Sequence, residues 1–262
     1  MQKTSIEVGS LIESDSPFVF LGIGSCFVQH FESFTEQHHL PMHCNPLGTS
    51  FNPISIGRQL QWLFSNDFNL LPPVDFQGIY HQLDAANKFQ HSDSAALEST
   101  TDSIRSEVID FIKGHQNHHK ILILSLGTAH AWMYDDQVVN NCHKLPNHFF
   151  ERKLLSLEDI VAYWTQVLPI IPEDWTIVYT VSAVKYTKIG WHENTLSKSV
   201  LHLVIDQLLP LRNNSYYFPS FEIITDILRD YSYYNEKGTH PTDQAAATVM
   251  EHFKTFLDLK SS

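Results

Sequence analysis

Residues 18–27 of this chain read FVFLGIGSCF, and this stretch decides the fold that the rest of the sequence builds. Its first six residues, 18–23, form a continuous apolar run, which is typical of a strand buried on both faces of a parallel sheet. Gly22 and Gly24 allow the backbone to turn tightly where the run ends. We therefore expect Ser25 to lie on a strand-to-helix turn.

Similar runs recur along the chain and alternate with segments of helical spacing. Residues 121–126 and 176–182 are continuous apolar runs, and 42–44 and 216–218 are weaker strand candidates. This alternation predicts right-handed crossovers and a three-layer α/β/α sandwich around a doubly wound, flavodoxin-like parallel sheet of about five strands. The segments with helical spacing are 27–38, 54–64, 95–113, 156–168, 193–209, 221–231 and 242–257.

The length of the chain favours one domain. With 262 residues it can bury one substantial core, so we expect a single domain over residues 1–262. Residues 66–94 contain Pro72, Pro73 and Gly78 and are expected to form an insertion or lid between helices.

Charge and cysteine content restrict the partners and the compartment. A formal net charge of −12 argues against nucleic acid and against anionic lipid as partners. No apolar stretch is long enough to span a bilayer, and the N-terminus is too polar for a secretion signal. Three cysteines without paired spacing predict no disulfide framework. We therefore expect a cytoplasmic protein without a membrane partner, whose oligomeric state stays open.

The residues that follow the strands are the candidates for chemistry, because ligands of such sheets bind beyond the carboxyl ends of the strands. Ser25 lies near a helix N-terminus, where free N–H groups favour developing negative charge. That position suits a nucleophile, and it equally suits a plain helix cap. His240 precedes the last helical segment and can return over the sheet edge to Ser25 as a general base. The alternative for His240 is one of sixteen histidines on a surface loop.

Two further loops offer groups for an oxyanion and a substrate. Gly48 is a candidate backbone donor, and Thr128 a candidate for a third oxyanion hydrogen bond. Ordinary turns and helix caps explain the same residue types. The candidate substrate-binding residues are Asn45, His143, Lys144 and Asn194, for which anchoring of loops is the alternative.

Rival chemistries have weaker support. Cys26 is a second candidate nucleophile, although a small buried side chain accounts for it as well. His115 and His119 have the spacing of metal ligands on a helix, but they precede the third strand at its amino end. The glycines at 22 and 24 lack the third glycine of a dinucleotide motif. We therefore predict no metal ion and no cofactor.

Residues 24–28, GSCFV, resemble the Gly-Ser-Cys-Phe-Ala motif that names the GSCFA domain family. The resemblance covers almost all of the chain from residue 18 onward. The other matching stretches are NPLG at 45–48, FNP at 51–53, LGTA at 126–129, NCHK at 141–144, TVS at 180–182, HEN at 192–194, SK at 197–198, YFPSFEI at 217–223, LRDY at 228–231 and HP at 240–241.

The GSCFA family is similar to the SGNH or GDSL hydrolases, which have a three-layer α/β/α sandwich. The resemblance implies that Ser25 is the nucleophile, Gly48 the oxyanion glycine and His240 the base. In the third block the chain departs from the SGNH pattern, because it has Gly127-Thr128 where those enzymes normally supply an asparagine.

A second departure lies beside His240. SGNH enzymes usually place an aspartate three residues before the catalytic histidine, and this chain has Lys237 there, with Glu236 one residue earlier. A cation at that place hinders formation of an imidazolium. Three alternatives stay open: Glu236 replaces the aspartate, a backbone carbonyl orients His240 in a dyad, or the chain is inactive.

The leading hypothesis is an SGNH-like serine esterase or deacylase. It acts on an O-acyl ester of a small molecule or saccharide through an acyl-enzyme, with Ser25, His240 and Glu236 as catalytic residues. One alternative is a non-catalytic ligand-binding protein on the same fold. Another is an O-acyltransferase, because water and an acceptor alcohol attack the same acyl-enzyme.

Overall fold

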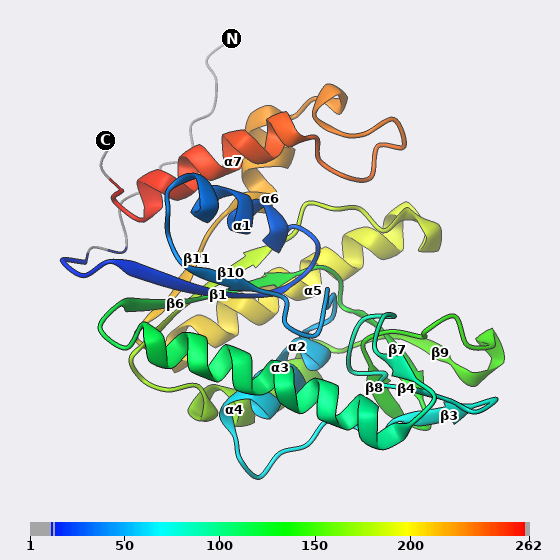
Figure 1. Cartoon of the computed structure of the whole chain (residues 1–262). Coiled ribbons are helices and arrows are strands. Elements are labelled where there is room, and N and C mark those ends of the chain that lie inside the picture. The colour runs from blue at the N-terminus through cyan, green and yellow to red at the C-terminus, as the bar shows by residue number, and fades with distance from the viewer. Residues whose placement is uncertain (1–11, 13, 260–262) are drawn as a thin grey trace.

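A five-stranded parallel sheet forms the centre of the molecule in the computed structural model, which describes Ile12 and residues 14–259 (Figure 1). The strand order is β11-β10-β6-β1-β2, and every neighbouring pair is parallel. All five predicted strands are confirmed, whereas the polar segment 1–11 lies outside the described residues. The strands are β1 (Phe18–Gly24), β2 (Met42–Cys44), β6 (His119–Leu126), β10 (Trp175–Val181) and β11 (Ser215–Tyr217).

Helices cover both faces of this sheet, so the predicted three-layer α/β/α sandwich is confirmed (Figure 1). The helices α1, α6 and α7 lie on one face, and α2, α3, α4 and α5 lie on the other. The α-helices are α1 (Val28–Gln37), α2 (Pro53–Phe64), α3 (Ser94–Gly114), α4 (Leu157–Val167), α5 (Trp191–Leu208), α6 (Ser220–Glu222) and α7 (Asp243–Phe256). The short helices are η1 (Asn147–Phe149), η2 (Leu168–Ile170), η3 (Thr187–Ile189), η4 (Leu209–Leu211), η5 (Ile223–Leu228) and η6 (Tyr231–Tyr233).

One helix differs from its prediction. The segment 221–231 was expected to be one continuous helix, but α6 passes into the π-helical turn η5, which ends at Leu228. Arg229 then takes a left-handed conformation, with φ of 47°, which breaks the helix.

The side chains of β1 alternate between two cores, as the pleat of a strand requires. Phe18 and Phe20 pack into the core beneath α1 and α7. Leu21 and Ile23 pack into the larger core beneath α2, α4 and α5. Burial on both faces explains why the run carries no polar residue before Ser25.

The order β2-β1-β6-β10-β11 corresponds to 2-1-3-4-5 when the sheet strands are counted along the chain. In this arrangement the chain reverses its direction of winding between β1 and β6, and a crevice opens beyond their carboxyl ends. Ser25 follows β1 directly and therefore lies at this point. Among the described helices, none is both long and apolar enough to cross a membrane.

Two small antiparallel sheets stand at one end of the sandwich, of which the sequence predicted only an insertion at 66–94 (Figure 1). Two-residue hairpin turns with positive φ form them, at Gln77-Gly78 and at Asp135-Asp136. A small apolar cluster that includes Leu83 and Val139 joins the two sheets. Their strands are β3 (Val74–Phe76), β4 (Ile79–His81) and β5 (Gln90–His91) in the first, and β7 (His130–Tyr134), β8 (Gln137–Val139) and β9 (Glu151–Leu154) in the second.

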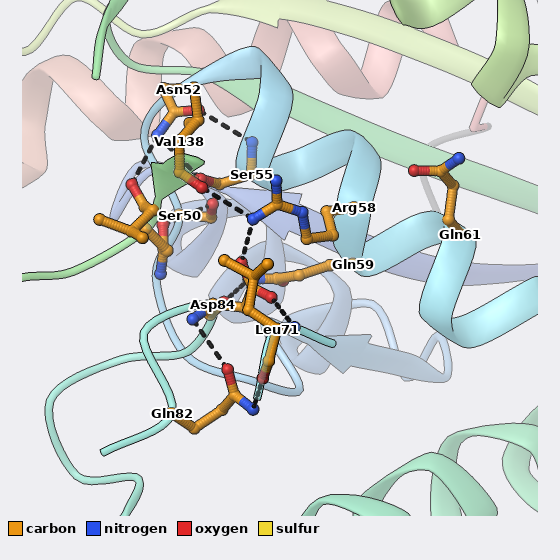
Figure 2. A network of polar contacts seen from close by, with 12 residues as sticks. Ser50, Asn52, Ser55, Arg58, Gln59, Gln61, Leu71, Gln82, Asp84 and Val138 are labelled. Atoms are coloured by element: carbon orange, nitrogen blue, oxygen red, sulfur yellow. Dashed lines mark hydrogen bonds and ion pairs between the residues drawn. The ribbon is translucent and has the colours of Figure 1, made fainter. Parts of the chain in front are cut away.

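A buried ion pair ties these sheets to the sandwich (Figure 2). Arg58 of α2 donates through Nη1 to Asp84 Oδ1 and to the Val138 carbonyl oxygen, both at 2.7 Å. The other oxygen of Asp84 accepts the Leu71 amide at 2.7 Å. Burial raises the pKa of the Asp84 carboxyl, and the Arg58 guanidinium and the Leu71 amide offset part of that rise. One cation thereby joins α2, the 66–94 segment and β8.

Candidate active site

The backbone holds Ser25 between the carboxyl ends of β1 and β6. Its amide donates to the Ser125 carbonyl oxygen at 2.9 Å. Gly24 has φ of 149°, and a Cβ there would lie 2.3 Å from that same oxygen, so only glycine fits this approach. α1 begins at Val28 and has Phe27 at its cap position. Ser25 is therefore not the helix cap, although its Oγ accepts the Phe27 amide at 3.3 Å.

The hydroxyl of Ser25 has a partner that the sequence reasoning missed. Ser25 Oγ lies 2.9 Å from Ser125 Oγ, and either hydroxyl can be the donor. Both side chains are buried, and Ser25 is only 1% exposed. The available signal was a lone serine inside the apolar run 121–126, because a polar group on a buried strand needs a hydrogen-bond partner.

Ser25 lies in the lining of a cavity of about 600 Å³ at the carboxyl end of the sheet. The walls come from loops that follow β1, β6 and β10 and from the sheet that contains β7, β8 and β9. Aromatic, amide and cationic side chains all contribute. The lining residues are Ser25, Cys26, Phe51, Asn52, Gly127, Thr128, His130, Ala131, Trp132, Asn140, Asn141, Cys142, Asn147, Phe150, Arg152, Ser182, Val184, Lys185, Tyr186 and His240.

His240 lines the same cavity, as its predicted return over the sheet edge requires. The side chain is exposed, and its Nδ1 lies 3.1 Å from Thr239 Oγ1. Asn235 Oδ1 accepts the amides of Thr239 and His240 and so holds this loop. Within the described chain the His240 ring makes no hydrogen bond to Ser25. The two residues share a cavity without direct contact.

The predicted acid partner of His240 is not beside it. Glu236 and Lys237 are both exposed and lie outside the cavity lining. Among the described residues neither one is hydrogen-bonded or ion-paired to His240, and the Thr239 hydroxyl takes that place. Residues 235–238 form a tight turn, in which the amide of Gly238 donates to the Asn235 carbonyl at 2.7 Å. This turn keeps Glu236 away from the His240 ring. In this conformation Glu236 does not replace the aspartate of the SGNH pattern.

The Gly48 amide is not free to donate to an oxyanion in this structure, so that role stays a prediction. This amide already donates to the Asn45 carbonyl oxygen at 2.7 Å, and Gly48 does not line the cavity. Gly48 instead serves a turn, because its φ is 79° and a Cβ there would lie 2.3 Å from the Ala86 Cβ. The amide of Ser25 is engaged as well, with Ser125.

Thr128 lies in the cavity wall, but its polar groups are engaged. Its amide donates to the Phe51 carbonyl, and its Oγ1 bonds Ser197 Oγ at 2.9 Å and accepts the His130 amide. By contrast, the Cys26 amide has no acceptor within the described part of the chain. The free donor next to Ser25 is therefore the amide of the following residue.

Three of the four residues predicted to bind substrate have side-chain hydrogen bonds to the backbone. Asn45 Oδ1 accepts the Gly24 amide at 2.8 Å and so holds its loop against β1. His143 Nε2 lies 3.1 Å from the Ala85 carbonyl oxygen, and His143 and Lys144 line a different cavity beside β4. Asn194 Oδ1 accepts the Tyr186 amide at 2.9 Å. The alternative of loop anchoring fits Asn45, His143 and Asn194, and none of these four residues lines the cavity of Ser25.

The structure also locates the residues that suggested a cysteine nucleophile or a metal site. Cys26 lies in the cavity lining, but burial raises the pKa of its thiol, which disfavours the reactive thiolate. His115 and His119 lie at the amino end of β6, where they bond the Phe111 carbonyl and Thr176 Oγ1. Within the described residues no cluster of three potential metal-binding side chains is present.

Lys198 of α5 is a buried cation that the sequence reasoning missed as a site residue. It is 4% exposed, and its Nζ donates to the carbonyl oxygens of Gly127 and Ser182, each at 2.6 Å. Both carbonyls belong to residues of the cavity wall, and a Cβ on Gly127 would lie 3.3 Å from the Ser25 Cβ. Burial lowers the pKa of Lys198 to about 7.

The comparisons with known proteins give a matching family and a similar solved structure. A family model described as the GSCFA family matches residues 19–253. The chain is similar to the crystal structure of a carbohydrate esterase family 3 from Talaromyces cellulolyticus, with 8% identity and a TM-score of 0.39, over 94% of this chain and 100% of that one. No match was found among curated proteins.

Proposed function

The chain belongs to the GSCFA family, and on that premise we propose that it is a serine esterase or deacylase that cleaves an O-acyl ester through an acyl-enzyme on Ser25. The observation that carries the proposal is the pairing of Ser25 with a free amide donor, that of Cys26, in one cavity that His240 also lines. A nucleophile, an oxyanion donor and a base are the groups that acyl transfer needs.

The proposed reaction has two steps. Ser25 Oγ bonds to the ester carbonyl carbon while His240 takes the hydroxyl proton, and the Cys26 amide stabilises the oxyanion. The ester C–O bond then breaks, and the proton passes from His240 to the leaving alcohol. Water attacks the acyl-enzyme in the same way, which releases the acid and restores Ser25. On this proposal the His240 ring leaves Thr239 when substrate binds, because catalytic hydrogen bonds often form only in the complex.

Labelling with a fluorophosphonate probe tests the proposal, because the probe reacts covalently with activated serines. We expect a stoichiometric adduct that peptide mass spectrometry assigns to Ser25 and that is lost in Ser25→Ala. His240→Ala should slow labelling about 100-fold or more, the usual effect of a general base. Cys26→Ala is the matched control for a neighbouring nucleophile and should keep the label. No labelling, or labelling that persists in Ser25→Ala, contradicts the proposal.

A non-catalytic ligand-binding protein is the second candidate, and two observations favour it. The Ser25 hydroxyl bonds Ser125 instead of His240, and Glu236 does not support His240. A binder should give no adduct with the probe, and Ser25→Ala should bind esters as the wild type does without any turnover. Hydrolysis of short-chain esters by the wild type that Ser25→Ala lacks rejects this candidate.

A further inference from the structure

Most neutral polar side chains of the cavity wall are already engaged within the protein. Asn52 caps α2 through its Oδ1. Asn140 accepts from the Ser50 hydroxyl and donates to the Thr49 carbonyl. Asn141 accepts the His143 amide. These three amide side chains are therefore at least partly occupied by the protein itself.

The cationic side chains of the same wall lack such partners. Arg152 and Lys185 make no hydrogen bond or ion pair through their charged groups within the described chain. Arg152 lies over the Trp132 ring, with its Cζ 5.7 Å from the ring centroid. Lys185 Nζ lies 3.9 Å from the Tyr234 centroid. Aromatic faces hold both cations in position and leave their hydrogen-bond donors free.

His130 is a second, independent polar group of this wall without a hydrogen-bond partner among the described residues. Its side chain is only 8% exposed, it lines the cavity, and neither ring nitrogen has a hydrogen-bond partner among the described residues. Four other described histidines have one buried ring nitrogen, Nδ1, without a hydrogen bond, whereas His130 has two. The nearest carboxylate oxygen, on Glu193, lies 3.7 Å from His130 Nε2. Burial, aided by the charge of Arg152, lowers the pKa of His130 against the influence of Glu193. As a neutral ring, His130 still offers one N–H donor.

The charge of the wall is opposite to that of the chain. The whole sequence carries a formal charge of −12, whereas none of the described residues that line this cavity is acidic. A cleft lined with one sign of charge concentrates ligands of the other sign. A neighbouring carboxylate would stabilise the charges of Arg152 and Lys185. None of the described lining residues supplies one.

We propose that the ester bound in this cavity carries a negatively charged group, and that Arg152, His130 and Lys185 form the subsite that receives it. This inference rests on the proposed function, because it takes an ester as the ligand. Arg152 contributes most, since its planar guanidinium suits bidentate bonds to carboxylate or phosphate oxygens. Lys185 contributes less, because its ammonium is a point charge that forms no bidentate pair and because the residue also borders a second, smaller cavity.

Calorimetric binding to the Ser25→Ala variant tests this charge preference without turnover. Two pairs of esters are compared, each differing only in charge. Monobenzyl glutarate and benzyl 4-carbamoylbutanoate carry the difference on the acyl side. The compounds 4-(acetoxymethyl)benzoate and 4-(acetoxymethyl)benzamide carry it on the alcohol side. The pair that responds identifies the side of the ester that faces the subsite.

We expect the anion of at least one pair to bind about tenfold more tightly than its amide, in line with measured charge pairs that are only partly desolvated. Adding Arg152→Gln should reduce that ratio to about threefold or less, and Lys185→Gln should reduce it by a smaller factor. Lys153→Gln is the matched control, because Lys153 is the next residue of β9, is exposed and does not line the cavity. The preference should also weaken as salt rises.

Three results overturn the subsite: equal binding of anion and amide in both pairs, no binding of any compound, or an equal loss in Lys153→Gln and Arg152→Gln. These results are distinct from failure of the esterase proposal. Charge preference without probe labelling of the wild type keeps the subsite and rejects the esterase. Labelling at Ser25 without charge preference does the reverse.

Discussion

Arg58 and Lys198 project from helices on the same face of the sheet, and both bury their charged ends, but only Arg58 meets a carboxylate. Asp84 neutralises the guanidinium, and the surrounding network joins α2 to the small sheets (Figure 2). Lys198 bonds two backbone carbonyls next to the cavity and has no counter-charge within the described chain. The two regions thus stabilise a buried cationic side chain differently, one through a carboxylate and the other through two backbone carbonyl oxygens.

The difference separates Arg58, a cation that holds elements of the fold together, from Lys198, whose burial favours loss of its proton. A paired guanidinium stays charged at every accessible pH, because arginine does not deprotonate in proteins. A lysine without a counter-charge loses its proton when burial makes the ammonium too costly. The neutral amine has two N–H groups, which match the carbonyl oxygens of Gly127 and Ser182, and one lone pair. Groups perturbed in this way are common at functional sites.

The largest effect should come from breaking the Arg58 pair. Asp84→Asn leaves the guanidinium buried without its counter-charge, and we expect a loss of about 3 to 5 kcal/mol in the free energy of unfolding. Urea unfolding measures this loss. Asp110→Asn removes the acid of the exposed pair with Lys113 and should change stability by about 0.5 kcal/mol at most. A loss below about 1 kcal/mol in Asp84→Asn would mean that the pair is not a structural link.

A smaller effect, specific to Lys198, should appear as a pH dependence. The pKa of Lys198 in the folded chain is about 7, below its ordinary value of 10.5, so between these values the unfolded chain binds more protons. Stability from this group therefore rises with pH across that window. Relative to Lys198→Met, the wild type should gain about 2 to 3 kcal/mol in unfolding free energy between about pH 7.5 and 9.5.

Urea unfolding at both pH values measures this gain. The contrasting variant combines Arg58→Met with Asp84→Asn, so that no buried carboxyl is left without its cation, and the wild type should gain nothing over it across the same pH range. A constant difference between the wild type and Lys198→Met would mean that Lys198 stays charged when folded, and the contrast between the two cations would fail.

The smallest effect should come from Ser197, the neighbour of Lys198. Its Oγ accepts the buried Ala129 amide at 2.8 Å, so Ser197→Ala should cost about 1 to 2 kcal/mol. The loss should be the same at both pH values, because no titrating group is removed. Ser199→Ala, on the exposed side of the same helix, should cost about 0.5 kcal/mol or less. If the loss in Ser197→Ala depends on pH, the titration is not specific to the amine of Lys198, and the contrast fails.

The parts of the fold that follow from burial could be predicted from the sequence. The run at β1 and those at β6 and β10 are apolar throughout, because both faces of each strand are covered. The strands β7 and β9 were missed, because β7 is mostly half-buried and β9 is mostly exposed and charged, so neither forms a buried apolar run. The Asp135-Asp136 turn between β7 and β8 was the available signal, and it is a weaker one than Asn-Gly.

The candidate site was predictable only in part. The glycines before Ser25 locate the turn, and the last loop locates His240. The acceptor of each amide was not predictable. The sequence suggested the Gly48 amide as an oxyanion donor, but in the structure this amide donates to the Asn45 carbonyl of its own turn.

The sequence by itself determined the order of the five central strands and of the helices between them, and the end of the sheet at which Ser25 lies, because periodicity and backbone constraints are local. Only the tertiary structure decided that Ser25 bonds Ser125, that Glu236 stays away from His240, and that Lys198 is buried without a carboxylate. Hydrogen-bond partners and dielectric surroundings come from residues far apart in the chain, so no local pattern encodes them.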